Sequence, residues 1–142
     1  MLEEGIFDIH CHIVPGVDDG AADIEETRKL LEMEYKQGVR NIILTPHFRF
    51  QMFETPLEKV QRQFRLAEEA AADISKDLHL YLGCEFHANM EMLPMLREKK
   101  VATMAGSKVC AGRILSQFRG ILYQRTPVCN AFRRVQTHCC TY

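Results

Sequence analysis

One stretch near the N-terminus, residues 6–20, constrains the fold more than any other part of the chain. It opens with an apolar, β-prone run, which predicts a short buried strand. The strand leads into a glycine-rich loop that contains Asp18 and Asp19. His10 and His12 are expected on the same side of this strand, because side chains alternate along a strand. Two imidazoles followed by two carboxylates can close around a metal ion, while the plainer interpretation is two half-exposed histidines and a solvated turn.

Two further strands are predicted, and each is followed by a residue type that binds metals. The pattern predicts a helix over residues 21–37 that ends at Gly38, and then a buried strand over residues 39–44 that leads to His47. A second helix is predicted over residues 56–75, and a third strand over residues 78–82 leads to Glu85. A short helix rich in methionine follows over residues 90–99.

This alternation of strands and helices favours a parallel sheet or barrel. In such α/β folds the chemistry gathers at the C-terminal ends of the strands, so we expect the side chains that follow the strands to converge. The predicted metal ligands are His10, His12, Asp18 or Asp19, His47 and Glu85. Mixed imidazole and carboxylate ligands suit manganese, iron or zinc better than calcium. Paired metals of this kind activate water for phosphoester hydrolysis, and amide hydrolysis also fits these ligands.

Composition excludes several other classes of protein. The chain has 142 residues, enough for one domain with a core, and its net charge of −1 gives no reason to expect a nucleic-acid partner. No run is long and apolar enough to span a membrane, and the N-terminus lacks the features of a signal peptide. We therefore expect a cytoplasmic protein, in which the six cysteines stay reduced.

The order of these motifs resembles the polymerase-and-histidinol-phosphatase (PHP) superfamily. The resemblance is carried by Asp8-Ile-His-Cys-His12, Pro15-Gly-Val-Asp-Asp-Gly20, Thr45-Pro-His47 and Leu82-Gly-Cys-Glu85. The residues of the first two motifs are similar to those of the bacterial tyrosine-protein phosphatase branch, the CpsB and YwqE types. The resemblance covers residues 1–108 and implies an α/β fold, the N-terminal half of a distorted barrel of the PHP type.

The resemblance also implies a function and a ligand set. It implies a metal-dependent phosphatase with two or three ions, commonly Mn²⁺, that acts on a phosphotyrosine protein, a bacterial tyrosine autokinase controlling polysaccharide export. Carried over by position, one metal site comprises His10, His12 and Glu85, and a second comprises His47 with Asp19, in preference to Asp18. Glu85 would bridge to a third ion.

Three remaining features of residues 1–108 carry no assigned role. His79 and His87 match no ligand of the family and are expected on the surface. Residues 48–55 are expected to form a loop with three phenylalanines, which either packs into the core or covers the site.

The composition changes abruptly at Val109, and residues 109–142 are called the tail below. The tail has five arginines but no lysine, aspartate or glutamate, so it carries +5 and the preceding residues carry −6. It holds four of the six cysteines and shows no clean strand or helix pattern. The later ligands of the family, a glutamate, a histidine and an Asp-x-His pair, and its phosphate-binding arginine are absent from it.

A shifted reading frame accounts for this change. One set of codons for residues 109–115, read one base later, encodes Tyr-Val-Leu-Val-Glu-Phe, and residues 134–141 similarly allow Gly-Phe-Lys-Pro-Ile-Val-Ala-His. Both strings are missing family motifs, and they occur in the family's order. We therefore predict a partial PHP phosphatase domain over residues 1–108 and an out-of-frame, poorly ordered tail, for which the alternative is a divergent basic segment.

Three functions follow from these observations. The first is a metal-dependent protein-tyrosine phosphatase that regulates capsule or exopolysaccharide synthesis, with activity impaired in this chain. The second is another PHP phosphatase, such as a histidinol-phosphatase, against which the Asp18-Asp19-Gly20 motif argues. The third is a non-catalytic metal-binding remnant.

Overall fold

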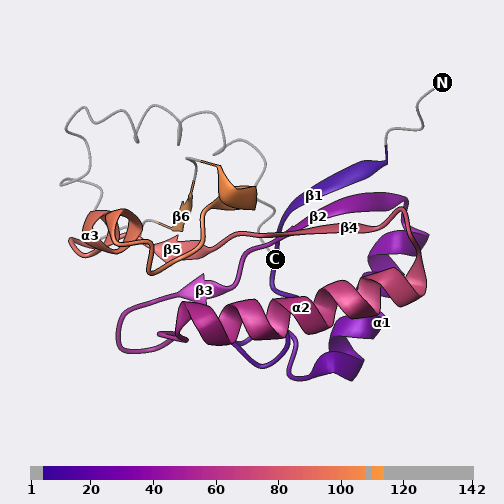
Figure 1. Cartoon of the computed structure of the whole chain (residues 1–142), viewed down its shortest axis with the longest axis horizontal. Coiled ribbons are helices and arrows are strands. Elements are labelled where there is room, and N and C mark those ends of the chain that lie inside the picture. The colour runs from indigo at the N-terminus through magenta and orange to yellow at the C-terminus, as the bar shows by residue number, and fades with distance from the viewer. Residues whose placement is uncertain (1–4, 108–109, 114–142) are drawn as a thin grey trace.

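Two three-stranded parallel sheets form the framework of the computed structural model, which describes residues 5–107 and 110–113 (Figure 1). The strand order is β1-β2-β4 in the first sheet and β3-β5-β6 in the second. In chain order the elements are β1 (Ile6–Cys11), α1 (Ile24–Lys36), β2 (Val39–Leu44), β3 (His47–Phe48), α2 (Leu57–Ile74), β4 (His79–Leu82), β5 (Glu85–His87), α3 (Met92–Arg97), the 3₁₀ helix η1 (Met104–Gly106) and β6 (Ala111–Arg113). Among the described helices, none combines the length and the apolar character that crossing a membrane requires.

The predicted α/β fold with parallel strands is confirmed, and the strands lie in two sheets, a division that was not predicted. The strands over residues 39–44 and 79–82 each stop and resume as a short strand, β3 or β5, that begins with a predicted ligand. Pro46 interrupts the first of them because it has no N–H to donate to the sheet. Gly83 interrupts the second, where a Cβ atom would lie 3.1 Å from Thr45 Cγ2 and 3.0 Å from Met104 Sδ. His47 and Glu85 therefore lie on a second, smaller sheet as paired neighbours.

The main core lies between the first sheet and the helices α1 and α2, which run along the same side of it (Figure 1). Ile42 and Leu44 of β2 are fully buried there, against Leu31 of α1 and Val60 of α2. A smaller core around Phe86 packs beneath the second sheet and α3. Two separate cores anchor the two sheets, and the predicted ligands lie where the sheets join.

The first strand is less buried than its apolar sequence predicts. β1 lies at the edge of the first sheet, and Ile6, Phe7 and Ile9 are 58%, 62% and 50% exposed. The prediction of a buried strand is therefore wrong for β1. Among the described residues only β2 pairs with this strand, so its outer side has no neighbour to cover it.

The start of α1 is set by a capping residue. Asp23 has extended backbone angles, and its side chain accepts a hydrogen bond from Glu26 N at 2.9 Å. The helix therefore begins at Ile24, three residues later than its apolar pattern predicts. At the other end Gly38 takes the left-handed conformation, φ +94°, that commonly closes a helix, as predicted.

Replacing Asp23 with alanine is expected to lower the free energy of unfolding by about 1 kcal/mol, because the cap bond to Glu26 is lost. Urea denaturation followed by circular dichroism would measure the change. Lys29→Ala, at an exposed position in the same helix, is the matched control and should change stability by less than about 0.5 kcal/mol. Equal effects of the two substitutions would contradict the assignment of the cap.

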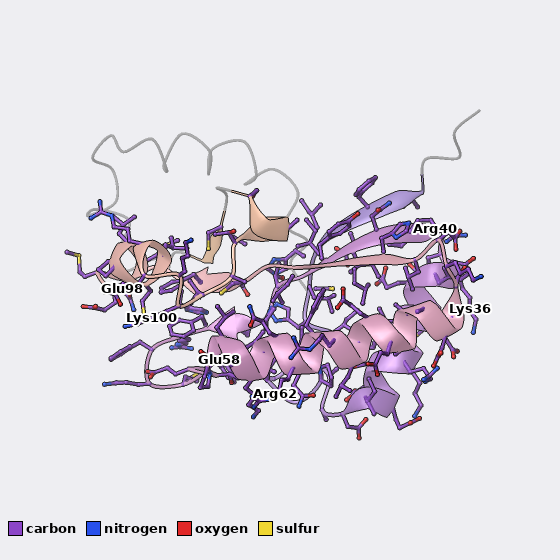
Figure 2. The ribbon with its side chains drawn as sticks, in the orientation of Figure 1. Lys36, Arg40, Glu58, Arg62, Glu98 and Lys100 are labelled. Carbon is purple, nitrogen blue, oxygen red and sulfur yellow. The ribbon has the colours of Figure 1, made fainter. Side chains whose placement is uncertain are left out.

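Arg40 holds together the end of the first sheet that lies away from the predicted ligands (Figure 2). Its guanidinium lies 3.9 Å from the ring centroid of Tyr35 and donates to the Tyr35 carbonyl at 2.9 Å. Its Nε lies 3.0 Å from Asp77 Oδ2, just before β4. One side chain thus connects the end of α1, the start of β2 and the turn before β4, a stabilising role at the N-terminal edge of the sheet.

Only residues 110–113 of the tail are described, and they contain a short strand that the sequence pattern did not predict. β6 pairs in parallel with β5, with Ala111 beside Glu85. This pairing uses backbone groups, so it needs little β-propensity from an Ala-Gly-Arg segment. The prediction that the tail contains no strand is therefore wrong for residues 111–113. The remainder of the tail lies outside the described residues.

Candidate metal centre

One carboxylate oxygen joins the three predicted histidine ligands. Glu85 Oε2 lies 2.9 Å from His47 Nδ1, 3.4 Å from His12 Nε2 and 3.7 Å from His10 Nε2. His10 and His12 face each other through their Nε2 atoms at 3.4 Å. The residues come from the ends of β1, β3 and β5, so the predicted convergence at strand ends is present in the structure.

Asp18 holds the ring of His12 in place. Its side chain is fully buried, and Oδ2 lies 2.9 Å from His12 Nδ1. The same carboxylate accepts hydrogen bonds from the backbone N–H groups of His47 and Gly20, at 2.9 and 3.0 Å. Burial opposes ionisation of Asp18, but these hydrogen bonds outweigh it and hold the pKa of the carboxyl below its usual range. With Nδ1 bound to Asp18, His12 presents Nε2 to the cluster, as histidine ligands of metals commonly do.

Thr45 performs the same task for His10. This buried threonine donates its hydroxyl hydrogen to the Cys11 carbonyl at 3.3 Å, and its oxygen lies 3.2 Å from His10 Nδ1. The hydroxyl oxygen can then accept from Nδ1, which leaves His10 Nε2 without a hydrogen and facing Glu85. The sequence analysis included Thr45 in a motif but gave it no role, although its place two residues before His47 was a signal.

Asp19 occupies a different position from its neighbour Asp18. Its side chain is 65% exposed, and Oδ1 lies 3.4 Å from His47 Nε2. The two aspartates therefore separate into a buried residue that orients His12 and an open carboxylate beside His47. This arrangement supports the preference for Asp19 over Asp18 as a ligand.

The side chains form two groups that fit metal ions. His10, His12 and Glu85 form one, and His12, Asp19 and His47 form the other, with the donor atoms of each group within 4.8 Å of one another. Ligands held about 2.0–2.2 Å from one ion lie about 3–4 Å apart. The His10–His12 and His–Glu85 separations, 2.9 to 3.7 Å, are close to this range. The Nδ1 atom of His47 is buried and lies 2.9 Å from Glu85 Oε2. Among the described residues it has no hydrogen-bond partner with good geometry, so a cation would suit it as a partner.

Protonation of the metal-free cluster centres on His12. Burial of the ring opposes its protonation, but hydrogen bonds to Asp18 and Glu85 outweigh burial and raise the pKa of His12 to about 9. Burial lowers the pKa of His10 despite the nearby Glu85. Burial also disfavours the ionised form of Glu85, yet the histidines around it hold its pKa below the usual range. At neutral pH a protonated His12 therefore pairs with the ionised carboxylates of Asp18 and Glu85.

The affinity for Mn²⁺ is expected to rise about tenfold per pH unit between pH 7 and pH 9 and then to level off, because one proton must leave His12 when a cation binds. Calorimetric titration under anaerobic conditions would measure it. Asp18→Asn removes a group that raises the His12 pKa, so the rise should move to lower pH. An affinity that does not change between pH 7 and pH 9 would contradict the protonated His12.

Two aromatic residues, Phe53 and His87, border His47. The sequence placed the loop of Phe53 at the site only as one of two alternatives, and it did not place His87 there. The ring of Phe53 stacks on the ring of His47, with centroids 5.4 Å apart and planes at 14°. His87 meets the same ring edge-on at 5.6 Å and is half-buried, so its predicted surface position is wrong, whereas His79 is exposed as predicted. His87 lies two residues after Glu85 on β5, and this alternation was a signal for a shared face.

The loop over residues 48–55 packs into the core with one phenylalanine and borders the site with another. Phe48 stacks on Phe86 in the smaller core, at 5.1 Å between centroids, and Phe53 stacks on His47. Phe50 and Met52, at the tip of the loop, are 53% and 56% exposed. Both interpretations of the loop are therefore partly right, since different residues serve each of them.

Comparison with known proteins places this chain in a family. The CpsB tyrosine-protein phosphatase of Streptococcus pneumoniae is 41% identical over 103 residues, which cover 72% of this chain and 42% of that protein. The YwqE tyrosine-protein phosphatase of Bacillus subtilis is 29% identical over 110 residues, 72% of this chain and 41% of that protein. The chain thus spans about two-fifths of the length of the curated relatives it matches.

The fold and a family model agree with these relatives. A chain from the crystal structures of YwqE from Bacillus subtilis and CpsB from Streptococcus pneumoniae, described as metal-dependent tyrosine phosphatases, matches with a TM-score of 0.71 and 25% identity. The match covers 78% of this chain and 44% of that chain. The family model for capsular polysaccharide synthesis, CpsB/CapC, matches residues 6–124 and so runs past Lys108. The chain therefore belongs to the CpsB/CapC family of capsular polysaccharide synthesis proteins.

Proposed function

We propose that this chain carries the N-terminal part of the active site of a metal-dependent protein-tyrosine phosphatase. The single observation that carries the proposal is the position of Glu85 Oε2, which faces an imidazole nitrogen of each of three histidines at successive strand ends. The proposed ligands are His10, His12, Asp19, His47 and Glu85. The names of the relatives, tyrosine-protein phosphatases described as metal-dependent, support this reaction class.

The chemistry follows from these ligands. When bound, a pair of ions supplies an activated water and holds the oxygens of a phosphate during in-line displacement. The protein's part is to present unprotonated nitrogens and carboxylates in fixed positions: Asp18 orients His12, and Thr45 orients His10. Mn²⁺ is the proposed metal, with iron and zinc as alternatives that the same nitrogen and oxygen ligands accept. Glu85 lies between the two groups, which suits a bridging carboxylate.

The proposed substrate is a phosphotyrosine protein in the cytoplasm, in particular a bacterial tyrosine autokinase. The family's description, capsular polysaccharide synthesis, supports a role in regulating capsule or exopolysaccharide production. The Asp18-Asp19-Gly20 motif and the tyrosine-phosphatase relatives argue against a histidinol-phosphatase.

The length of the chain favours a second candidate function, that of a non-catalytic metal-binding fragment. The chain corresponds to 42% of the Streptococcus pneumoniae relative, and its tail lacks the later ligands of the family. We propose accordingly that residues 1–108 form a partial phosphatase domain and that residues 109–142 are translated out of frame. In that case the chain binds metal but turns over little or no substrate.

Hydrolysis of a phosphotyrosine peptide tests both candidates. The DNA is resequenced across the codons for Lys108 and Val109, and two proteins are compared: the 142-residue chain and the product of the frame-corrected gene. We expect Mn²⁺-dependent hydrolysis by the corrected protein, abolished by His12→Ala, and little or none by the 142-residue chain.

The controls separate the alternatives. Histidinol phosphate, offered to the corrected protein, should be a poor substrate. Strong hydrolysis of the phosphotyrosine peptide by the 142-residue chain, abolished by His12→Ala, would contradict the proposal that an out-of-frame tail leaves the chain with little activity. A corrected protein that needs no metal would contradict the proposed function.

A further inference from the structure

We propose that Phe53 is the platform for the aromatic ring of an aryl phosphate whose phosphate binds at the metal centre, so that this residue makes the site select aryl over alkyl phosphates. The inference rests on the proposed phosphatase function and adds to it the residue that recognises the tyrosine ring. Its basis is the stacking of Phe53 on His47, together with the apolar surface that continues from it.

The first argument is distance. The Phe53 and His47 ring centroids lie 5.4 Å apart with nearly parallel planes, and the two nitrogens of His47 point to Glu85 and Asp19. A metal on His47 lies about 2.0–2.2 Å from its nitrogen. The ring of an aryl phosphate bound there starts one ester oxygen beyond the phosphorus, within reach of Phe53. Aromatic rings attract one another at about 4.5–7 Å between centroids, a range that an alkyl group cannot use in the same way.

The second argument is rigidity. Arg49 and Phe53 close the loop with two backbone hydrogen bonds, Arg49 N to Phe53 O at 2.9 Å and Phe53 N to Arg49 O at 2.8 Å. Beyond the loop, the Thr55 hydroxyl donates to the Val17 carbonyl at 2.9 Å, which ties it to the segment that carries Asp18 and Asp19. The Phe53 ring is therefore held in a fixed position before a ligand arrives, which lowers the cost of binding.

The third argument is exposure. Phe53 is half-buried, so part of its ring stays open although one face covers His47. Phe50 and Met52, at the tip of the same loop, are more than half exposed. Phe48 differs, because its ring packs on Phe86 in the smaller core. The described residues thus present apolar surface beside a polar cluster, the combination that an aryl phosphate ester needs.

Binding of two matched phosphonates tests the proposal without turnover. Benzylphosphonate and ethylphosphonate both carry a methylene in place of the ester oxygen, and only the first has a ring. Calorimetry on the Mn²⁺-loaded 142-residue chain is expected to give about fivefold tighter binding of benzylphosphonate. Phe53→Leu should remove this preference and leave the affinities for ethylphosphonate and Mn²⁺ unchanged.

Phe7→Leu is the matched control, because Phe7 is an exposed phenylalanine at the opposite end of β1 from the cluster. This variant should keep the fivefold preference. Equal binding of the two phosphonates by the unmodified chain would overturn the inference but not the proposed function. Loss of Mn²⁺ affinity in Phe53→Leu would also overturn it, since Phe53 would then act by holding His47. Failure of the Mn²⁺-loaded chain to bind either phosphonate would overturn the inference and would match the second candidate function, the non-catalytic metal-binding fragment.

Discussion

Replacing Glu85 with glutamine is expected to lower the affinity of the chain for Mn²⁺ by about a hundredfold or more. Loss of a residue that merely orients a metal ligand costs about ten- to a hundredfold, and Glu85 faces the cluster directly. Its Oε2 atom approaches His10, His12 and His47 within 3.7 Å, so one substitution weakens both proposed ion sites. Glutamine keeps the shape of the side chain but removes the negative charge that offsets the cations.

Competition with a fluorescent chelator would measure the change in Mn²⁺ affinity. Glu68→Gln, on the exposed side of α2, removes the same charge away from the cluster and should leave the affinity unchanged. A second readout needs no metal: Glu85 helps to raise the pKa of His12 to about 9, so that pKa should fall in the glutamine variant. Unchanged Mn²⁺ affinity together with an unchanged His12 titration would show that Glu85 is not the shared carboxylate.

The positions of the proposed ligands at strand ends were predictable because they depend on local patterns. An apolar strand, then a histidine or glutamate, recurs at His10, His47 and Glu85, and parallel strands bring their C-terminal ends to one edge. The division into two sheets was not predicted, since it depends on how closely Gly83 approaches Thr45 and Met104 from other elements.

The separate roles of Asp18 and Asp19 depend on tertiary contacts. The sequence shows only two adjacent aspartates and does not distinguish them. Asp18 is buried because it accepts the backbone N–H of His47, which lies 29 residues further along the chain. Asp19, one residue on, points to the open side of the same histidine. The preference for Asp19 as a ligand came from a family resemblance and stays a prediction, which the open position of its carboxylate beside His47 supports.

The exposure of β1 and the burial of His87 depend in the same way on neighbours in space. An apolar strand is expected to be buried, but β1 lies at a sheet edge and only one of its sides meets the core. His87 was expected at the surface because it matches no ligand of the family. In the structure a further strand, β5, includes both Glu85 and His87. The two side chains therefore lie on the same face, and the ring of His87 contacts the ring of His47.

Replacing Gly20 with alanine is expected to lower the free energy of unfolding by about 3 kcal/mol and the Mn²⁺ affinity by at least about tenfold. A Cβ atom on Gly20 would lie 2.1 Å from the His12 carbonyl oxygen and 2.6 Å from His12 Cβ, far inside van der Waals contact. The loop closes on this point, because Ala21 N donates to the His12 carbonyl at 3.0 Å. The clash must therefore move His12, whose ring is aligned by Asp18 and faces Glu85.

Gly106→Ala separates this clash from the general cost of changing a glycine. Gly106 has a left-handed backbone, φ +69°, but a Cβ atom there meets nothing within 4 Å. Its replacement should cost about 1–2 kcal/mol through backbone strain alone and leave Mn²⁺ binding intact. Thermal unfolding and Mn²⁺ titration of both variants measure the two effects. If Gly20→Ala loses stability without losing Mn²⁺ affinity, the loop tolerates a shift of His12, and the close packing of Gly20 serves folding rather than the metal centre.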